Sequence, residues 1–174
     1  MITIVVGTNR KNALSATIAE YYQKILAEKN IESQILSLID LPADFTATAL
    51  YENNGKNNSF NLFREAFNKH QKFVFIIPEY NNSYPGVLKA FIDGMDYPSG
   101  LEGKKCALVG ISAGVQGASI ALSHFTDVLN YLGMHVLALK VKMGEVHIHL
   151  KENQLTHKVY NEMLYAQADQ LISF

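Results

Sequence analysis

Short apolar runs alternate with segments of helical periodicity along the whole chain. The apolar runs have the length of strands and end at glycine, proline or polar residues, which is typical of strands buried in a parallel sheet. They cover residues 2–6, 31–38, 73–77, 106–111 and 136–141. Between them, apolar residues recur at every third or fourth position, as in amphipathic helices. These helices are expected at residues 14–26, 60–70, 85–95, 118–132 and 155–171.

Five strands, each followed by a helix, predict an α/β fold in three layers, with a five-stranded parallel sheet covered by helices on both faces. Sheets of this size commonly have the strand order 2-1-3-4-5, and they bind ligands at the carboxyl ends of the strands near the switch point. The loops after strands one, three and four are then expected to meet at one rim. The length and the lack of a linker or repeat predict a single domain over residues 1–174.

Composition narrows the classes of function. The formal net charge is -1 and no basic cluster is present, so nucleic acid and anionic membranes are not expected partners. No apolar stretch approaches the roughly 20 residues of a membrane span, and the first apolar run is too short for a signal peptide. The single cysteine, Cys106, lies in an apolar strand and is expected to be an inert core thiol. The expected location is the cytoplasm.

The loop after the first strand is polar, basic and opens a helix. Thr8, Asn12 and Ser15 offer hydroxyl or amide groups, and Arg10 offers charge-assisted hydrogen bonds. Because a helix N-terminus presents free N–H groups and a positive dipole end, this loop predicts a phosphate cradle. The alternative is a helix capped by Asn12 or Ser15 with a solvated Arg10. The loop matches neither the dinucleotide fingerprint nor the Walker motif.

The two other loops of the rim are also unusual. Residues 78–86 combine two tyrosines, two asparagines and two prolines, which favours a stiff border for a planar heterocycle. The alternative is a stiff surface turn. Residues 112–118 contain Gly114 and Gly117, which allow a backbone to approach a flat ligand closely, although glycine loops are also common as flexible connections.

Taken in order, the three loops resemble the NADPH-dependent FMN reductase family, which also includes quinone, chromate and azo-dye reductases. The family motifs are Gly-Ser/Thr-x-Arg, then Pro-Glu-Tyr-Asn followed by Ser and by Leu-Lys-x-x-Ile-Asp, and finally Ser-x-Gly-x-x-Gly. The resemblance covers nearly the whole chain. The matching residues are Gly7-Thr8-Asn9-Arg10, Pro78-Glu79-Tyr80-Asn81, Ser83, Leu88-Lys89-Ala90-Phe91-Ile92-Asp93 and Ser112-Ala113-Gly114-Val115-Gln116-Gly117.

The resemblance implies a flavodoxin-like fold, a bound FMN, and a homodimer or homotetramer with the flavin near a subunit interface. By position, the FMN phosphate would be held by Thr8, Arg10 and Ser15. The isoalloxazine would be bordered by Pro78, Glu79, Tyr80 and Asn81, and on its other side by Ser112, Gly114 and Gly117. The remaining expected cofactor-binding residues are Asn12, Ala13, Leu14 and Ala113. The family often has serine where this chain has Ala13, so Asn12 or Ser15 would replace that hydroxyl.

The implied activity is electron transfer from NADPH or NADH through FMN to a quinone, a free flavin, an azo compound or a similar small acceptor. The flavin carries the chemistry and the protein supplies geometry, so no catalytic residue is predicted. The polar segment 42–58, with Tyr51, is a candidate for part of the substrate wall. His147 and His149 lie on one side of an extended segment without an evident third ligand, so no metal site is predicted.

Three alternatives remain at this stage. A non-enzymatic flavodoxin-type electron carrier shares the fold, but such carriers are usually strongly acidic, unlike this chain. A receiver domain needs an acidic pocket, whereas Pro78 and Glu79 follow the third strand here. A cofactor-binding module without reductase activity is kept open by Ala13.

Overall fold

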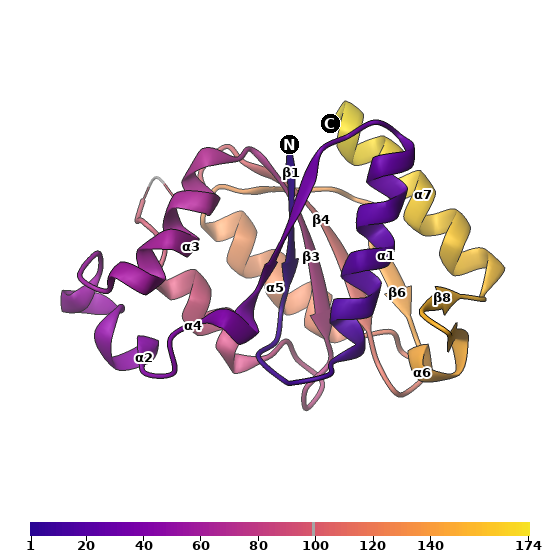
Figure 1. The fold of residues 1–174 in the computed structure, drawn as a ribbon, viewed down its shortest axis with the longest axis horizontal. Coiled ribbons are helices and arrows are strands. Elements are labelled where there is room, and N and C mark those ends of the chain that lie inside the picture. The colour runs from indigo at the N-terminus through magenta and orange to yellow at the C-terminus, as the bar shows by residue number, and fades with distance from the viewer. Residues whose placement is uncertain (99) are drawn as a thin grey trace.

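A central parallel sheet lies between two layers of helices in the computed structural model, which describes residues 1–98 and 100–174 (Figure 1). The strand order is β2-β1-β3-β4-β5, with β6 also paired to β4, so the expected order 2-1-3-4-5 is confirmed. The strands of the sheet are β1 (Ile2–Val6), β2 (Ser33–Ser37), β3 (Lys72–Pro78), β4 (Lys105–Ile111), β5 (His135–Val136) and β6 (Val141–Met143).

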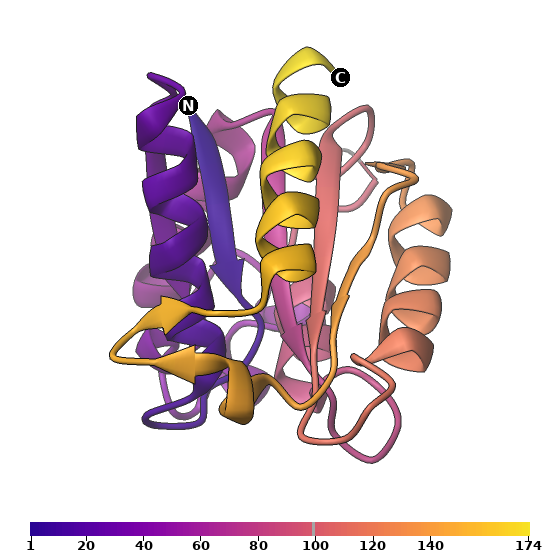
Figure 2. The same cartoon turned by 90° about the vertical axis from the view of Figure 1, so that its right-hand side faces the viewer.

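The helices cover the sheet on both faces: Figure 1 shows α1 and α7 on one side of it and α3, α4 and α5 on the other, and Figure 2 looks onto the face that α1 and α7 cover. One face packs against α1 and α7 and the other against α3, α4 and α5. Successive residues of β3 alternate between the two hydrophobic clusters, so its unbroken apolar run follows from burial on both faces. These helices are α1 (Leu14–Glu28), α3 (Asn58–Lys69), α4 (Gly86–Asp93), α5 (Ser119–Tyr131) and α7 (Lys158–Ser173).

The prediction of one continuous fifth strand at residues 136–141 is wrong. The chain pairs with β4 through β5, leaves the ladder, and pairs again through β6. In the gap, the buried Gln167 of α7 donates its amide to the carbonyl oxygens of Leu108 at 2.9 Å and Leu139 at 2.8 Å. A side chain of the last helix therefore substitutes for the missing contacts of the ladder.

The last helix begins at Lys158, so the prediction that it starts at residue 155 is also wrong. Leu155 belongs to a two-stranded antiparallel hairpin, whose turn places Glu152 and Asn153 at positive φ. The buried Leu155 is in phase with the apolar stripe of the helix, which is why periodicity merged the two. The remaining short elements are η1 (Leu38–Asp40), α2 (Phe45–Thr48), η2 (Tyr51–Asn53), α6 (Val146–His149), β7 (Leu150–Lys151) and β8 (Gln154–Leu155).

The core agrees with the apolar pattern. Phe60 and Phe67 are fully buried, and the Phe67 ring stacks on Phe73 with centroids 4.1 Å apart. Cys106 is buried, which raises the pKa of its thiol, as expected for an inert core cysteine.

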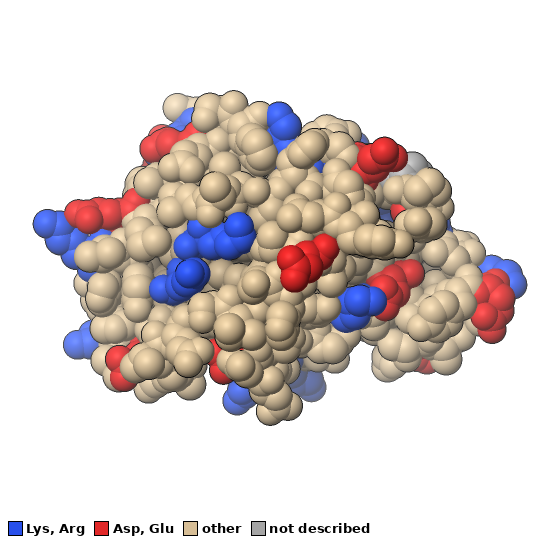
Figure 3. All heavy atoms as spheres, turned by 180° about the vertical axis from the view of Figure 1, so that it is seen from behind, with Lys and Arg blue, Asp and Glu red and all other residues tan. Residues whose placement is uncertain are grey.

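The surface carries both signs of charge. On the face turned away from the viewer of Figure 1, lysines and arginines are interspersed with acidic residues on a mostly uncharged surface (Figure 3). Among the described residues, no helix combines the length and the apolar character needed to cross a membrane.

Candidate functional site

The carboxyl ends of β1, β3, β4 and β6 surround a hollow of about 250 Å³. The structure therefore brings together the three loops that the sequence placed at one rim. The expected site residues that line the hollow are Arg10, Asn12, Ala13, Leu14, Ser15, Pro78, Glu79, Tyr80, Ser112 and Ala113. Those outside its lining are Thr8, Asn81, Gly114 and Gly117.

The first turn of α1 borders the hollow without a side-chain cap. Its N-cap residue is Ala13, and no acidic residue lies in the first turn. The alternative in which Asn12 or Ser15 caps the helix is therefore wrong. The Ser15 side chain is fully buried, and its hydroxyl has no hydrogen-bond partner among the described residues. Free N–H groups, an unpartnered hydroxyl and the exposed Arg10 together suit an anion such as a phosphate.

Thr8 connects the first loop to the second. Its buried hydroxyl lies 2.7 Å from the hydroxyl of Tyr80 and accepts a hydrogen bond from the backbone N–H of Arg10 at 3.2 Å. Thr8 thus holds Tyr80 and Arg10 in place, while those two residues line the hollow.

The second loop is a tight two-residue turn. Tyr80 and Ser83 exchange backbone hydrogen bonds of 2.8 and 3.0 Å, and Asn81 and Asn82 between them have φ values of 51° and 62°. Positive φ at both central residues defines a type I′ turn, which asparagine tolerates better than most residues. The stiffness expected from the prolines therefore comes largely from this turn.

The third loop is closed by its own serine. The Ser112 hydroxyl donates to the carbonyl of Gly114 at 2.6 Å and accepts from the N–H of Gly117 at 3.0 Å. Gly117 has φ of 59°, and a Cβ there would lie 2.6 Å from the Lys142 backbone, so it is needed for packing against β6. A Cβ on Gly114 would meet no atom within 4 Å, so the space beside that part of the loop is open.

A fourth wall of the hollow comes from α6, through Val146 and His147. The prediction that His147 and His149 share one side of an extended segment is wrong, because both lie in this short helical turn. The His149 ring packs instead against His157 and Tyr160. Among the described residues, no group of three side chains suited to a metal ion is present. The carboxyl ends of all strands of a parallel sheet meet at one rim. The segment after the last strand was therefore to be expected at the hollow, and this indication was missed.

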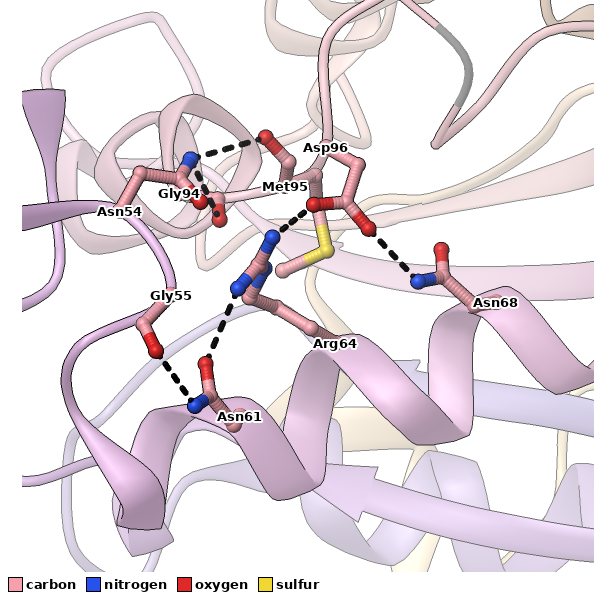
Figure 4. Close-up of polar contacts among 8 residues, drawn as sticks. All are labelled: Asn54, Gly55, Asn61, Arg64, Asn68, Gly94, Met95 and Asp96. Carbon is pink, nitrogen blue, oxygen red and sulfur yellow. Dashed lines mark hydrogen bonds and ion pairs between the residues drawn. The ribbon is translucent and has the colours of Figure 1, made fainter.

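The polar segment 42–58 contributes no residue to the lining of the hollow. It is attached to the start of α3 and to the residues after α4 (Figure 4). Asn61 donates to the carbonyl of Gly55 at 2.9 Å and accepts from Arg64 at 3.0 Å, and Arg64 also pairs with Asp96. Asn54 donates to the chain after α4. A role of this segment in the substrate wall stays a prediction.

Comparison with known proteins gives consistent matches. The model of a family described as NADPH-dependent FMN reductase matches residues 1–147. A 2-hydroxy-1,4-benzoquinone reductase of Burkholderia sp is 27% identical over 163 residues, covering 88% of this chain and 79% of that protein. An FMN-dependent NADPH-azoreductase of Staphylococcus aureus is 26% identical over 186 residues, covering 98% of this chain and 93% of that protein. The solved structure of FerB, a flavoenzyme NAD(P)H:(acceptor) oxidoreductase from Paracoccus denitrificans, superposes with a TM-score of 0.81 at 25% identity, covering 99% of this chain and 94% of that one.

Proposed function

The chain belongs to the NADPH-dependent FMN reductase family, and we propose that it passes electrons from NADPH or NADH through FMN to a quinone, an azo compound, a free flavin or a similar small acceptor. Family membership makes it an NAD(P)H-dependent flavin reductase with FMN as cofactor. The relatives named for quinone and azo reduction support the class of acceptor.

The observation that carries the site assignment is the buried, unpartnered Ser15 hydroxyl at the uncapped start of α1, which lines the hollow. An unsatisfied buried hydroxyl costs free energy unless a ligand supplies its partner. A phosphate placed there would accept from this hydroxyl, from the first N–H groups of α1 and from Arg10. The donor set of the hollow therefore fits the phosphate end of FMN.

The other loops have the character that a flat ring system requires. We assign the ring border to Pro78, Glu79 and Tyr80 on one side, and to Ser112, Ala113 and Gly114 on the other. Thr8 and Gly117 support these loops from outside the lining of the hollow, because Thr8 fixes Tyr80 and Gly117 lets its loop pack on β6. FMN, when bound, accepts the hydride and delivers the electrons, so the protein acts by orienting it and by leaving one face accessible.

The assembly is proposed to be a homodimer or homotetramer of single-domain subunits. Large apolar side chains remain on the surface of the chain, among them Tyr131, which is 81% exposed, and Leu62, which is 66% exposed. Only contiguous apolar patches are typical of subunit interfaces, so the proposal rests on the family to which the chain belongs and these side chains are candidates for the contact. The mass of the holoenzyme in solution tests this proposal.

The test of function uses the full chain with added FMN. We expect FMN to bind, measured by the change in flavin fluorescence and by co-elution with the protein. We expect the loaded protein to oxidise NADPH or NADH when benzoquinone or an azo dye is present. Binding without any nicotinamide oxidation would instead indicate a flavodoxin-type carrier or a cofactor-binding module. Absence of FMN binding at micromolar protein would overturn the site assignment.

A further inference from the structure

The wall of the hollow that α6 forms contains one side chain able to donate a hydrogen bond to a ligand. Of the two residues that α6 contributes, Val146 is buried and apolar, whereas His147 is exposed to the solvent that fills the hollow. In the part of the chain that the structure describes, no hydrogen bond or ion pair involves the His147 ring. Its ring nitrogens therefore remain available.

The chain just before His147 is firmly held. The backbone N–H of Val146 donates to the carbonyl of Ser112 at 3.2 Å, and that of Glu145 donates to the carbonyl of Gly114 at 2.9 Å. Behind them, the Tyr160 hydroxyl lies 3.3 Å from the Gly144 carbonyl oxygen, to which it donates. His147 thus projects from a segment fixed to the third loop, which is the support that a binding residue needs.

The position of α6 favours the phosphate end of the ligand over the ring. Val146 belongs to the hydrophobic cluster that α1 and α7 form on one face of the sheet. The hairpin after α6 continues on that face, beside the first turns of α1, in both Figure 1 and Figure 2. The ring border, in contrast, lies between the ends of β3 and β4. α6 and the start of α1 therefore lie on the same face of the sheet and border the same hollow.

If only the start of α1 bound the phosphate, some phosphate oxygens would accept no hydrogen bond from the protein. Ala13 and Leu14 supply no side-chain donor, although both line the hollow. An imidazole always carries at least one N–H donor, and two when protonated, so it suits this place in either state. The charged side chains that share the hollow are Arg10 and Glu79, and neither forms an ion pair with His147 among the described residues.

We propose that His147 binds the phosphate of FMN from the wall of the hollow that α6 forms, an inference that rests on the proposed function. His147 is then a specificity residue, since it favours binding of FMN over riboflavin, which has the same ring but lacks the phosphate. Its contribution takes the place of a donor that Ala13 does not supply.

The experiment compares dissociation constants of FMN and riboflavin, measured by flavin fluorescence with the full chain. The variants are His147→Ala, His147→Gln and, as a matched control on the same helical turn, His149→Ala. We expect His147→Ala to weaken FMN binding about tenfold and riboflavin binding less than about twofold. His147→Gln keeps an N–H donor and is expected to fall between wild type and His147→Ala. His149→Ala is expected to change FMN binding less than about twofold.

The outcomes separate the two proposals. If wild type binds FMN but His147→Ala binds it equally well, the inference fails and the proposed function stands. Equal weakening of FMN and riboflavin would move His147 to the ring, and equal losses in His147→Ala and His149→Ala would reduce its role to the stability of α6. Either result overturns the inference. Wild-type protein that binds no FMN would overturn both proposals. Thermal unfolding of each apo variant establishes that the chain is folded.

Discussion

Polar groups differ between the edge of the sheet where the strands begin, here called the amino edge, and the edge where they end, the carboxyl edge. At the amino edge, the buried Lys104 donates to three backbone carbonyls at and just after the end of α3, at 2.6, 2.7 and 3.2 Å. Beside it, Nδ1 of His70 lies 2.8 Å from the Thr3 hydroxyl and 3.2 Å from the amide nitrogen of Gln34. These groups are satisfied within the chain and serve the fold.

At the carboxyl edge, polar groups are left without partners. The Ser15 hydroxyl is buried and unpartnered among the described residues, α1 begins without a side-chain cap, and Arg10 is exposed. Buried polar groups normally find partners, so an unpartnered buried hydroxyl at an uncapped helix start beside a hollow suits a binding site. At the amino edge, polar groups of the sheet stabilise the fold. At the carboxyl edge, they remain available to bind a ligand.

The largest effect is expected at the amino edge, from Lys104→Met. The variant keeps the length of the side chain but leaves the carbonyls at the end of α3 without their charged donor. We expect the free energy of unfolding, measured by urea denaturation, to fall by about 3 kcal/mol. FMN affinity of the folded variant should stay within about twofold of wild type. A loss below about 1 kcal/mol would mean that the amino edge does not depend on this cap.

Arg10→Ala is expected to weaken FMN binding and to leave the stability of the apo protein nearly unchanged. Because Arg10 is exposed, the free energy of unfolding of the apo protein should change by less than about 0.5 kcal/mol. The dissociation constant of FMN should rise about 30-fold, or about 2 kcal/mol, because a charge-assisted contact to phosphate is lost. Riboflavin binding provides the control, and Arg10→Lys should lose less than Arg10→Ala. Equal weakening of both flavins would contradict a phosphate contact.

Ser15→Ala is expected to change stability and binding in opposite directions. Removal of an unsatisfied buried hydroxyl should raise the free energy of unfolding of the apo protein by about 0.5 kcal/mol. The same change should weaken FMN binding about fivefold. Urea denaturation and flavin fluorescence measure the two quantities. A variant that is less stable and binds FMN as wild type does would show that Ser15 belongs to the fold rather than to the site.

The smallest effect is a pH dependence at the amino edge. Burial, with the positive N-terminus and Lys69, lowers the pKa of His70 from its ordinary 6.5. The unfolded chain then binds this proton more readily than the folded chain, so the stability contributed by neutral His70 is present above pH 6.5 and is lost as the pH falls through the lower folded pKa. One proton limits the slope to about 1.4 kcal/mol per pH unit.

Urea denaturation at a series of pH values tests this dependence, with His70→Gln as the control. Both proteins keep the other histidines, so only the difference between their pH profiles reports on His70. The wild-type profile should fall more steeply below about pH 6.5 than that of His70→Gln. Parallel profiles would show that the histidine contributes nothing to the acid sensitivity of this edge.

Local patterns were sufficient for most of the architecture. The apolar runs at residues 73–77 and 106–111 identified β3 and β4 because strands buried on both faces must be apolar at every position. The order of the strands then placed three loops at one rim, and the structure brings those loops together around the hollow. The roles of the individual residues in binding FMN stay predictions.

What the sequence determined by itself was the alternation of strands and helices, the parallel sheet and the loops that carry the family motifs, because each depends on neighbouring residues along the chain. Only the tertiary structure decided how polar groups are shared between distant segments. Gln167 reaches from α7 to the break in the fifth strand, and the Thr8 hydroxyl contacts Tyr80 and lies outside the lining of the hollow. His147, far from α1 in the chain, lines the same hollow as the start of α1. Hydrogen-bonding groups have a limited number of partners, and which partner each one obtains depends on residues that are far apart in the chain and close in space.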